Sequence, residues 1–337
     1  MEIKAAPRRC LVVGSGSIAR RHISNLRKIL PNTEVACISA SGRVLLEDET
    51  DSTLILASME LAIEWSPEFC IVASPAPYHI KHAKIFLQLG IPVLIEKPLS
   101  DSLSNVGAEG DFLYSHRNLI QIAYNLRYLS SAREMKRLIR GAKIGHIYSV
   151  HIDVGQYLPD WRPQSDYRHN VSANKKLGGG VLLELSHEFD YLLWLFGQFN
   201  KVYCITSLSR HLEIDVEDSA DIILSRNDGL VAQLHMDFLQ KRPTRKCKVI
   251  GELGTLLWDL RGNTIFFENG YSEERIFSDP NSTPNDSYIQ LLRNFIDTMF
   301  GNGVPQNTLE DGISVLEMIE AMRHSSLTGL PAFIKSI

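Results

Sequence analysis

Two short motifs combine residue types that could take part in one reaction. The run Gly14-Ser-Gly-Ser-Ile-Ala19 follows one apolar stretch, and Glu96-Lys97-Pro98 follows another further along the chain. Glycines at these spacings allow a tight turn and a close backbone approach to a dinucleotide pyrophosphate. A lysine after a later strand lies where ligands of open α/β sheets bind. Together the motifs predict a nicotinamide enzyme in which Lys97 faces the reacting carbon.

The first motif matches the pattern Gly-x-Gly-x-x-Ala between a strand and a helix. Gly14 permits the turn, Gly16 admits the pyrophosphate, and Ala19 is small enough for close packing of the helix on the strand. The N-terminus of the helix offers free N–H groups to phosphates. We therefore expect residues 14–18 (Gly14, Ser15, Gly16, Ser17 and Ile18) to bind the cofactor. The alternative is a tight turn with no ligand.

The end of the second strand favours NADP over NAD as the cofactor. NAD enzymes usually place an acidic residue there for the ribose hydroxyls, whereas this chain has Ile38-Ser-Ala-Ser-Gly-Arg43. Ser39, Ser41 and Arg43 would suit a 2′-phosphate, and Arg20 or Arg21 could add charge. Alternatively, Arg43 is an ordinary solvated residue and either cofactor binds.

A loop and an apolar helix in the second half could bind and react with a substrate. His187 lies in the helix expected at 181–196, after Gly178-Gly-Gly180, and histidine suits proton transfer near neutral pH. The loop before it is rich in aromatic and cationic side chains that could stack on a sugar or hold an acidic group: Tyr157, Trp161, Arg162, Arg168 and Lys175. Alternatively, His187 is a core or capping residue and the loop is an ordinary surface loop.

The elements that must position these residues indicate an α/β protein of two domains. Residues 1–126 alternate apolar strands with helices, which predicts an N-terminal Rossmann domain with a doubly wound parallel sheet. Residues 127–337 predict an α+β domain for substrate binding and oligomerisation, with a largely antiparallel, open-faced sheet. Its expected strands are 144–154, 201–207, 218–225, 230–237, 245–250, 255–260 and 264–268. Helices are expected at 103–115, 132–140, 181–196, 288–300 and 309–325, and the late helices could pack on the first domain.

Composition excludes several classes of function. The net charge of −4 and pI of about 6.3 argue against a nucleic-acid partner or an anionic membrane. No run approaches the ~18 apolar residues that span a bilayer. The five cysteines form no Cys-x-x-Cys pair, which favours reduced core residues in a cytoplasmic protein. No metal site is expected, because pairs such as His79 and His82 lack the accompanying ligands.

With these motifs the chain resembles the glucose–fructose oxidoreductase/inositol dehydrogenase/rhizopine-catabolism (Gfo/Idh/MocA) family. The resemblance extends over nearly the whole chain, and the motifs occur in the same order as in the family. They are Glu96-Lys-Pro98, Ala73-Ser-Pro-Ala-Pro-Tyr-His79, Tyr124-Asn-Leu-Arg127, Gly178-Gly-Gly180 through His187, and Gly251-Glu-Leu-Gly-Thr255. The loop from Leu158 to Pro163 with Leu185-Ser-His-Glu188 resembles members encoded among surface-glycan and nonulosonic-acid biosynthesis genes.

The resemblance implies hydride transfer to or from a sugar, polyol or similar secondary alcohol by a homodimer or homotetramer. It places Lys97 beside the nicotinamide and the reacting oxygen, and makes His187 the proton acceptor or donor. It implies a cofactor-lining position for Ala73, Ser74, Pro75, His79, Glu96 and Asn125. The subgroup favours an acidic or nucleotide-linked sugar. The alternatives are a redox-neutral epimerase, dehydratase or glycosidase that uses the cofactor, and an inactive nucleotide-binding regulator.

One position departs from the family pattern. Many relatives have an aspartate four residues before the histidine, where this chain has Leu183. Glu184 could replace that aspartate, Asp190 could orient the imidazole ring, or the role could be absent. We count Glu184 with Lys97 and His187 as candidate catalytic residues.

Overall fold

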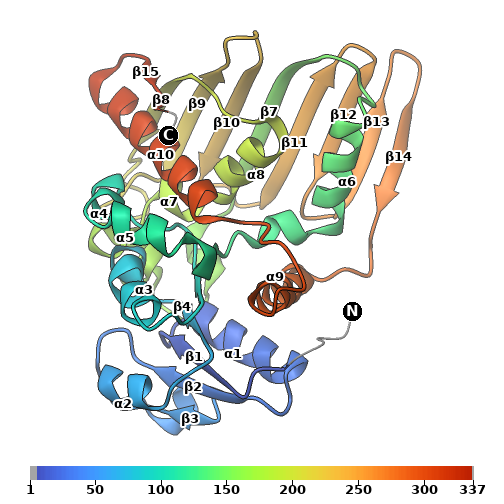
Figure 1. Ribbon diagram of the computed structural model, residues 1–337. Coiled ribbons are helices and arrows are strands. Elements are labelled where there is room, and N and C mark those ends of the chain that lie inside the picture. The colour runs from blue at the N-terminus through green and yellow to red at the C-terminus, as the bar shows by residue number, and fades with distance from the viewer. Residues whose placement is uncertain (1–5, 336–337) are drawn as a thin grey trace. The chain divides into compact units, whose positions relative to one another are not determined.

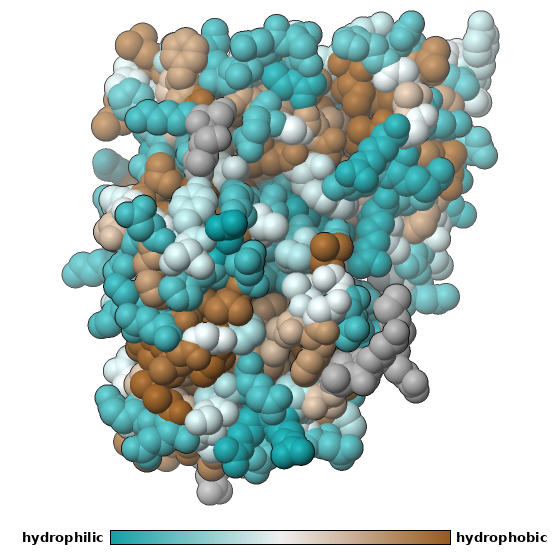
Figure 2. All heavy atoms as spheres, viewed as in Figure 1, coloured by the Kyte–Doolittle hydropathy of each residue, from teal (hydrophilic) through white to brown (hydrophobic). Residues whose placement is uncertain are grey.

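The computed structural model describes residues 6–335, which form two compact units. Within this range the first unit comprises residues 6–125 and 284–313, and the second comprises residues 126–283 and 314–335. Within the described residues the strands form two sheets, one of six strands and one of nine. Figure 1 shows the elements of each unit, and Figure 2 shows hydrophilic and hydrophobic side chains intermixed on the face viewed.

The first sheet lies in the first unit and is wholly parallel, with strand order β3-β2-β1-β4-β5-β6. Its strands are short apolar runs, as expected for a parallel sheet covered on both faces. They are β1 (Arg9–Val13), β2 (Glu34–Ile38), β3 (Leu54–Ile55), β4 (Phe69–Val72), β5 (Val93–Ile95) and β6 (Ile120–Ile122). The helices of this unit are α1 (Ser17–Ile29), α2 (Met59–Glu64), α3 (His79–Leu87), α4 (Leu103–Gly107), α5 (Gly110–Ser115) and α9 (Pro284–Met299).

The second sheet is mostly antiparallel, with order β14-β13-β12-β11-β7-β10-β9-β8-β15. One pair, β7 with β10, is parallel. Buried and exposed residues alternate along its strands, so one face packs on helices while the other is open. The strands are β7 (Ile147–Gly155), β8 (Lys201–Ser207), β9 (Ser219–Ser225), β10 (Val231–Asp237), β11 (Thr244–Gly251), β12 (Gly254–Asp259), β13 (Thr264–Glu268), β14 (Glu273–Ser278) and β15 (Ala332–Phe333).

Helices α6 (Ser130–Arg140), α7 (Val181–Glu184) and α8 (His187–Phe196) pack on one side of the second sheet (Figure 1). The last helix, α10 (Leu309–Thr328), contains the boundary between the two units. The α/β architecture predicted from the sequence, a parallel Rossmann sheet plus a largely antiparallel open sheet, is confirmed.

Several predicted elements are corrected. The helix predicted at 181–196 is two helices, because Leu185 and Ser186 leave the helical pattern between α7 and α8. The helix predicted at 103–115 is likewise divided into α4 and α5. Strands β14 and β15 were not predicted: β14 is a charged, exposed strand and β15 has only two residues.

Candidate active site

The residues expected to bind the cofactor follow the carboxyl ends of adjacent parallel strands in the first sheet. Gly14 follows β1, Ser39 follows β2, and Ala73 follows β4. Glu96 and Lys97 follow β5, and Asn125 lies shortly after β6. Since parallel strands end at the same edge, these residues line one edge of the sheet, where nucleotides bind in open α/β folds.

The glycine turn between β1 and α1 has the backbone that its sequence predicted. Gly14 has φ +127°, and a Cβ there would lie 2.5 Å from the Ala73 carbonyl oxygen, so a side chain is excluded. The Cβ position of Gly16 has no protein atom within 4 Å, so the backbone there is open to a close ligand. Gly16 is also the N-cap of the 13-residue α1. The turn therefore fits a dinucleotide pyrophosphate.

An acidic residue that the sequence analysis missed lies beside the expected 2′-phosphate position. Glu49 accepts two hydrogen bonds from Arg43, at 2.8 Å from Nη1 and 2.5 Å from Nη2. The Arg43 guanidinium lowers the pKa of Glu49 to about 2. Ser39 Oγ and Ser41 Oγ are 3.1 Å apart. A 2′-phosphate on Arg43 would therefore take the place of the Glu49 carboxylate.

The turn that carries Lys97 is fixed by buried polar contacts. Glu96 Oε1 lies 2.6 Å from Nε2 of His22, on α1, and Glu96 Oε2 accepts a hydrogen bond from the Lys97 N–H at 3.1 Å. The Lys97–Pro98 peptide is cis. Lys97 itself is partly buried, which argues against an ordinary exposed lysine at a strand end.

The remaining positions on this edge are mostly buried. Ala73, Ser74 and His79 are all less than one-tenth exposed, and Pro75 is intermediate. Asn125 is also buried, and its Nδ2 donates to Ser287 Oγ on α9 at 2.7 Å. Most of the residues expected to line the cofactor are therefore packed into this edge of the sheet.

In the second unit, His187 is the first residue of α8 and is buried. Glu184 ends α7, so the break at residues 185 and 186 separates these two candidates. The single helix expected at 181–196 is thus interrupted between these two residues. Tyr191, one turn beyond His187, packs edge-on against Trp258 at a ring distance of 5.3 Å.

Two ion pairs anchor α8 one turn or less from His187. Asp190 accepts from Arg127 through Nη2 at 2.6 Å and Nε at 3.0 Å, and both side chains are almost fully buried. Glu188 pairs with Arg245 on β11 at 2.9 Å. Asp190 is therefore held by Arg127 in a buried ion pair.

The loop between β7 and α7 is built from four short 3-10 helices, η5 (Leu158–Trp161), η6 (Tyr167–His169), η7 (Val171–Ala173) and η8 (Lys175–Leu177). Trp161 donates from Nε1 to the Gln156 carbonyl at 3.2 Å and packs edge-on against Phe238. The ammonium of Lys241 lies over the Tyr157 ring. Both aromatic residues therefore have neighbours that fix them within the loop.

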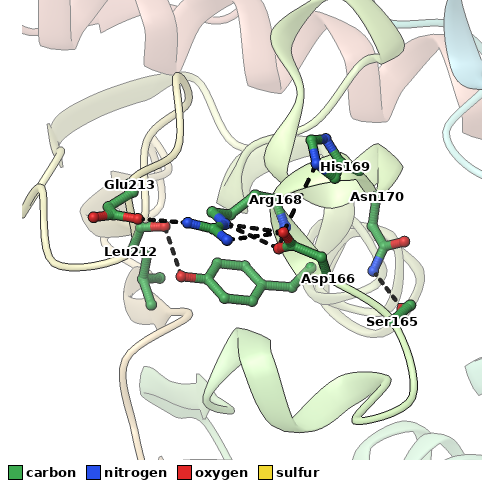
Figure 3. A network of polar contacts seen from close by, with 8 residues as sticks. Ser165, Asp166, Arg168, His169, Asn170, Leu212 and Glu213 are labelled. Atoms are coloured by element: carbon green, nitrogen blue, oxygen red, sulfur yellow. Dashed lines mark hydrogen bonds and ion pairs between the residues drawn. The ribbon is translucent and has the colours of Figure 1, made fainter.

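Arg168 lies at the centre of the polar network in Figure 3. Its Nε and Nη2 donate to Asp166 at 2.9 Å, and its Nη1 donates to Glu213 at 2.8 Å. The Tyr167 hydroxyl donates to the Leu212 carbonyl at 2.9 Å. The network ties the loop to the segment before β9 and engages the guanidinium of Arg168 internally.

The other two predicted cations of the loop are placed differently. Arg162 is exposed, and no ion pair of its side chain is found within residues 6–335. Lys175 donates its backbone N–H to Asp215 at 2.9 Å, while its side chain is exposed. Arg162 and Lys175 are therefore better placed than Arg168 to bind an incoming anion.

Sequence reasoning missed three residues that organise the site: His22, Glu49 and Arg127. Arg127 stands within a quoted motif, and His22 follows Arg20 and Arg21, but their partners are 63 and 74 residues away in the chain. Among the described residues there is no cluster of three or more potential metal ligands. No helix within that range is long and apolar enough to cross a membrane.

Comparison with known families gives two matches that together span most of the chain. Residues 8–124 match the model of the oxidoreductase family with an NAD-binding Rossmann fold, GFO/IDH/MocA. Residues 132–257 match the GFO/IDH/MocA C-terminal domain.

Individual relatives are distant but similar over their full length. Inositol 2-dehydrogenase 1 of Saccharopolyspora erythraea is 23% identical, with 96% of this chain and 95% of that protein covered. A levoglucosan dehydrogenase in complex with NADH superposes with a TM-score of 0.83 at 16% identity, over 98% of this chain and 99% of the other. The WlbA dehydrogenase of Bordetella pertussis, in complex with NADH and UDP-GlcNAcA, superposes with a TM-score of 0.80 at 18% identity, over 99% of this chain and 100% of the other.

Proposed function

Because this chain belongs to the GFO/IDH/MocA family of oxidoreductases and carries its NAD-binding Rossmann fold, we propose that its substrate is a sugar, sugar acid or nucleotide-linked sugar. The reaction is hydride transfer between the nicotinamide and a secondary alcohol or ketone of that substrate. The main support is the edge of the first sheet. There the glycine turn follows β1 and Lys97 follows shortly after β5, and only β4 separates these two parallel strands.

The chemistry divides among three side chains. When bound, the nicotinamide supplies or accepts the hydride. Lys97 donates a hydrogen bond to the reacting oxygen and stabilises negative charge that develops there. His187 takes the hydroxyl proton in oxidation and returns it in reduction. Glu184 supplies the carboxylate in place of the family aspartate.

We propose NADP as the preferred cofactor, with NAD as the alternative. Ser39, Ser41 and Arg43 supply two hydroxyls and a guanidinium after β2, and Glu49 competes for that guanidinium. The variant Glu49→Gln should therefore tighten NADPH by about 3- to 10-fold, because a charge-assisted hydrogen bond that competes with the phosphate is weakened. NADH affinity should change by less than about 2-fold. Equal affinities of wild type and variant for NADPH would reject the 2′-phosphate assignment.

The preferred substrate class is an acidic or nucleotide-linked sugar. Support comes from the exposed cations Arg162 and Lys175 on the loop before α7, and from the UDP-GlcNAcA bound by the WlbA structure of the same fold. Arg162 can bind a carboxylate or phosphate through two parallel hydrogen bonds. The aromatic rings of Tyr157 and Trp161 offer flat surfaces for a sugar ring.

A homodimer or homotetramer formed through the open face of the second sheet completes the proposal. Tyr203 and Ile223 lie opposite one another on β8 and β9 and are exposed, as is Ile205. Light scattering of the wild type should give two or four times the chain mass, and Ile223→Asp should lower it. A monomeric wild type would reject this part of the proposal without affecting the others.

The activity is tested with a panel of substrates and both cofactors. Sugars, uronic acids and UDP-linked sugars are incubated with NADP⁺ or NAD⁺, and their keto forms with the reduced cofactors, while nicotinamide absorbance is followed. The proposal expects a net absorbance change with at least one acidic sugar. Product formation with no net change would establish a redox-neutral reaction instead. Absence of any turnover across the panel would reject the sugar oxidoreductase proposal.

A further inference from the structure

His79 holds two main-chain carbonyl groups at the edge of the first sheet. It is the first residue of α3, and its side chain is buried. Nδ1 lies 2.8 Å from the Pro98 carbonyl oxygen and Nε2 lies 2.7 Å from the Ser74 carbonyl oxygen. One contact fixes the residue after Lys97, and the other fixes the segment that follows β4.

The chemistry of these contacts specifies the protonation of the ring. A carbonyl oxygen only accepts hydrogen bonds, and a neutral imidazole carries a proton on one nitrogen only. With a neutral ring, one of the two contacts would set a nitrogen lone pair against a carbonyl lone pair inside the protein. Both contacts are favourable only when both nitrogens carry protons, so the geometry selects the imidazolium.

The surroundings contain charges of both signs. Burial is the largest influence on His79 and lowers its pKa below the usual value, although its two carbonyl partners and the nearby Glu96 oppose this shift and Lys97 adds to it. The charged form is inferred instead from the two carbonyl contacts, which a neutral ring cannot both satisfy. His82, on the next turn of α3, bonds Ser74 Oγ through Nδ1 at 3.0 Å, and burial lowers its pKa to about 4. Glu96, Lys97 and His82 are therefore the titratable groups that surround the His79 ring.

The same turn is fixed from its other side by contacts of similar kind. Glu96 connects His22 of α1 to the backbone N–H of Lys97. Lys97 therefore stands between a residue held by His22 and a residue held by His79. Removing the His79 contacts would release the Pro98 side of the turn while leaving the Glu96 side intact.

We propose that His79 is a positioning residue, present as the imidazolium, that holds the turn of Lys97 and thereby sets the rate of the chemical step rather than the affinity for the cofactor. The kinetic part rests on the function proposed above, while the protonation state does not. This role differs from the cofactor-lining position that the family resemblance implies.

Nitrogen-15 NMR of the imidazole groups tests the protonation state on the wild-type protein without substrate. The His79 resonance, assigned by its loss in His79→Gln, should show protons on both nitrogens at pH 7. It should remain so when the pH is raised above the range in which an unperturbed histidine loses its proton. A singly protonated His79 at pH 7 would overturn the proposal whatever the enzyme catalyses.

Kinetics of His79→Gln and His79→Leu test the positioning role. Both variants should lower kcat by about 10- to 100-fold, since a small misplacement of a reacting group costs this much. KM for the cofactor should change by less than about 2-fold. His79→Gln, which can still donate to one carbonyl, should retain more kcat than His79→Leu. An unchanged kcat with a weakened cofactor would overturn the role. If no substrate is turned over by the wild type, the proposed function fails while the NMR result stands.

Discussion

The turn around Lys97 and the loop at 156–177 are held in place in opposite ways. Around Lys97 the side chains that make the contacts are buried: His22 is 0% exposed, His79 1% and Glu96 5%. In the loop the ion pairs are exposed: the side chains of Arg168 and Glu213 are 47% and 70% accessible. The first region belongs to the cofactor-binding unit and the second to the unit that carries His187.

This difference in burial implies that the Lys97 turn is held in one arrangement, whereas the loop can rearrange. Hydrogen bonds inside the protein are strengthened by low dielectric, and breaking one leaves a buried group unsatisfied, so the Lys97 turn has one favourable arrangement. Exposed ion pairs contribute about 0 to 1 kcal/mol and exchange readily with water. On the proposed function, the group that meets the reacting oxygen is preorganised, whereas the loop that meets the substrate can adjust to it.

The largest effect on catalysis is expected in the turn around Lys97. Lys97→Ala should lower kcat by about 100- to 10,000-fold, because it removes a charged donor from the reacting oxygen. Lys81→Ala, which alters an exposed lysine of the same unit, serves as the control and should leave kcat unchanged. Steady-state kinetics with a substrate from the panel provide the measurement. A Lys97→Ala enzyme of near-normal kcat would contradict the assignment of the lysine.

The second largest effect is expected on the free energy of unfolding, when the buried ion pair between Arg127 and Asp190 of α8 is broken. Asp190→Asn should lower the free energy of unfolding by about 3–5 kcal/mol, because it leaves the buried Arg127 charge without its anion. The double variant Arg127→Met/Asp190→Leu should recover much of the loss, since it removes both charges. Urea denaturation measures both. A loss below about 1 kcal/mol for Asp190→Asn would place this pair in the same class as the exposed loop pairs.

The exposed network should respond more weakly and should depend on salt. Arg168→Gln should lower the free energy of unfolding by at most about 1 kcal/mol, and the difference should nearly vanish in ~1 M NaCl. Its KM for an acidic sugar should rise much less than that of Arg162→Gln, because Asp166 and Glu213 already hold Arg168. A larger KM effect for Arg168→Gln would show that the substrate displaces these carboxylates.

The smallest effect concerns a half-exposed histidine on the open sheet. Burial opposes the charged form of His235, but hydrogen bonds and charges of Asp221 and Asp237 raise its pKa above 6.5. A raised folded-state pKa gives a stabilisation that is complete below the unfolded pKa and is lost as pH rises through the folded value. The stability difference between wild type and His235→Gln should therefore shrink above about pH 6.5. A difference that grows with rising pH would reverse the assignment.

The sequence predicted best where structure is local. The strands of the first sheet are short, mostly apolar runs, and β1 ends directly at Gly14, so strand, turn and helix could be located there from composition and spacing. The roles of Gly14 and Gly16 followed from the same turn, and the structure gives each glycine the expected geometry.

Features that depend on distant contacts escaped prediction. The apolar pattern continues across Leu185 and Ser186, so it gave no sign of the break that separates Glu184 from His187. Partners such as His22 with Glu96 are set by the fold, since no local pattern relates residues 74 positions apart. Strand β14 escaped because edge strands can be charged and exposed.

Titration of the purified wild-type protein with NADPH and, separately, NADH, followed by nicotinamide fluorescence, tests the central claim most directly. The account predicts saturable binding to one site per chain, tighter for NADPH, which is abolished by Gly14→Val because a side chain there would collide with the Ala73 carbonyl. Tighter binding of NADH would retain the oxidoreductase and remove the 2′-phosphate assignment. Binding of neither nucleotide, with no cofactor retained from purification, would contradict the account.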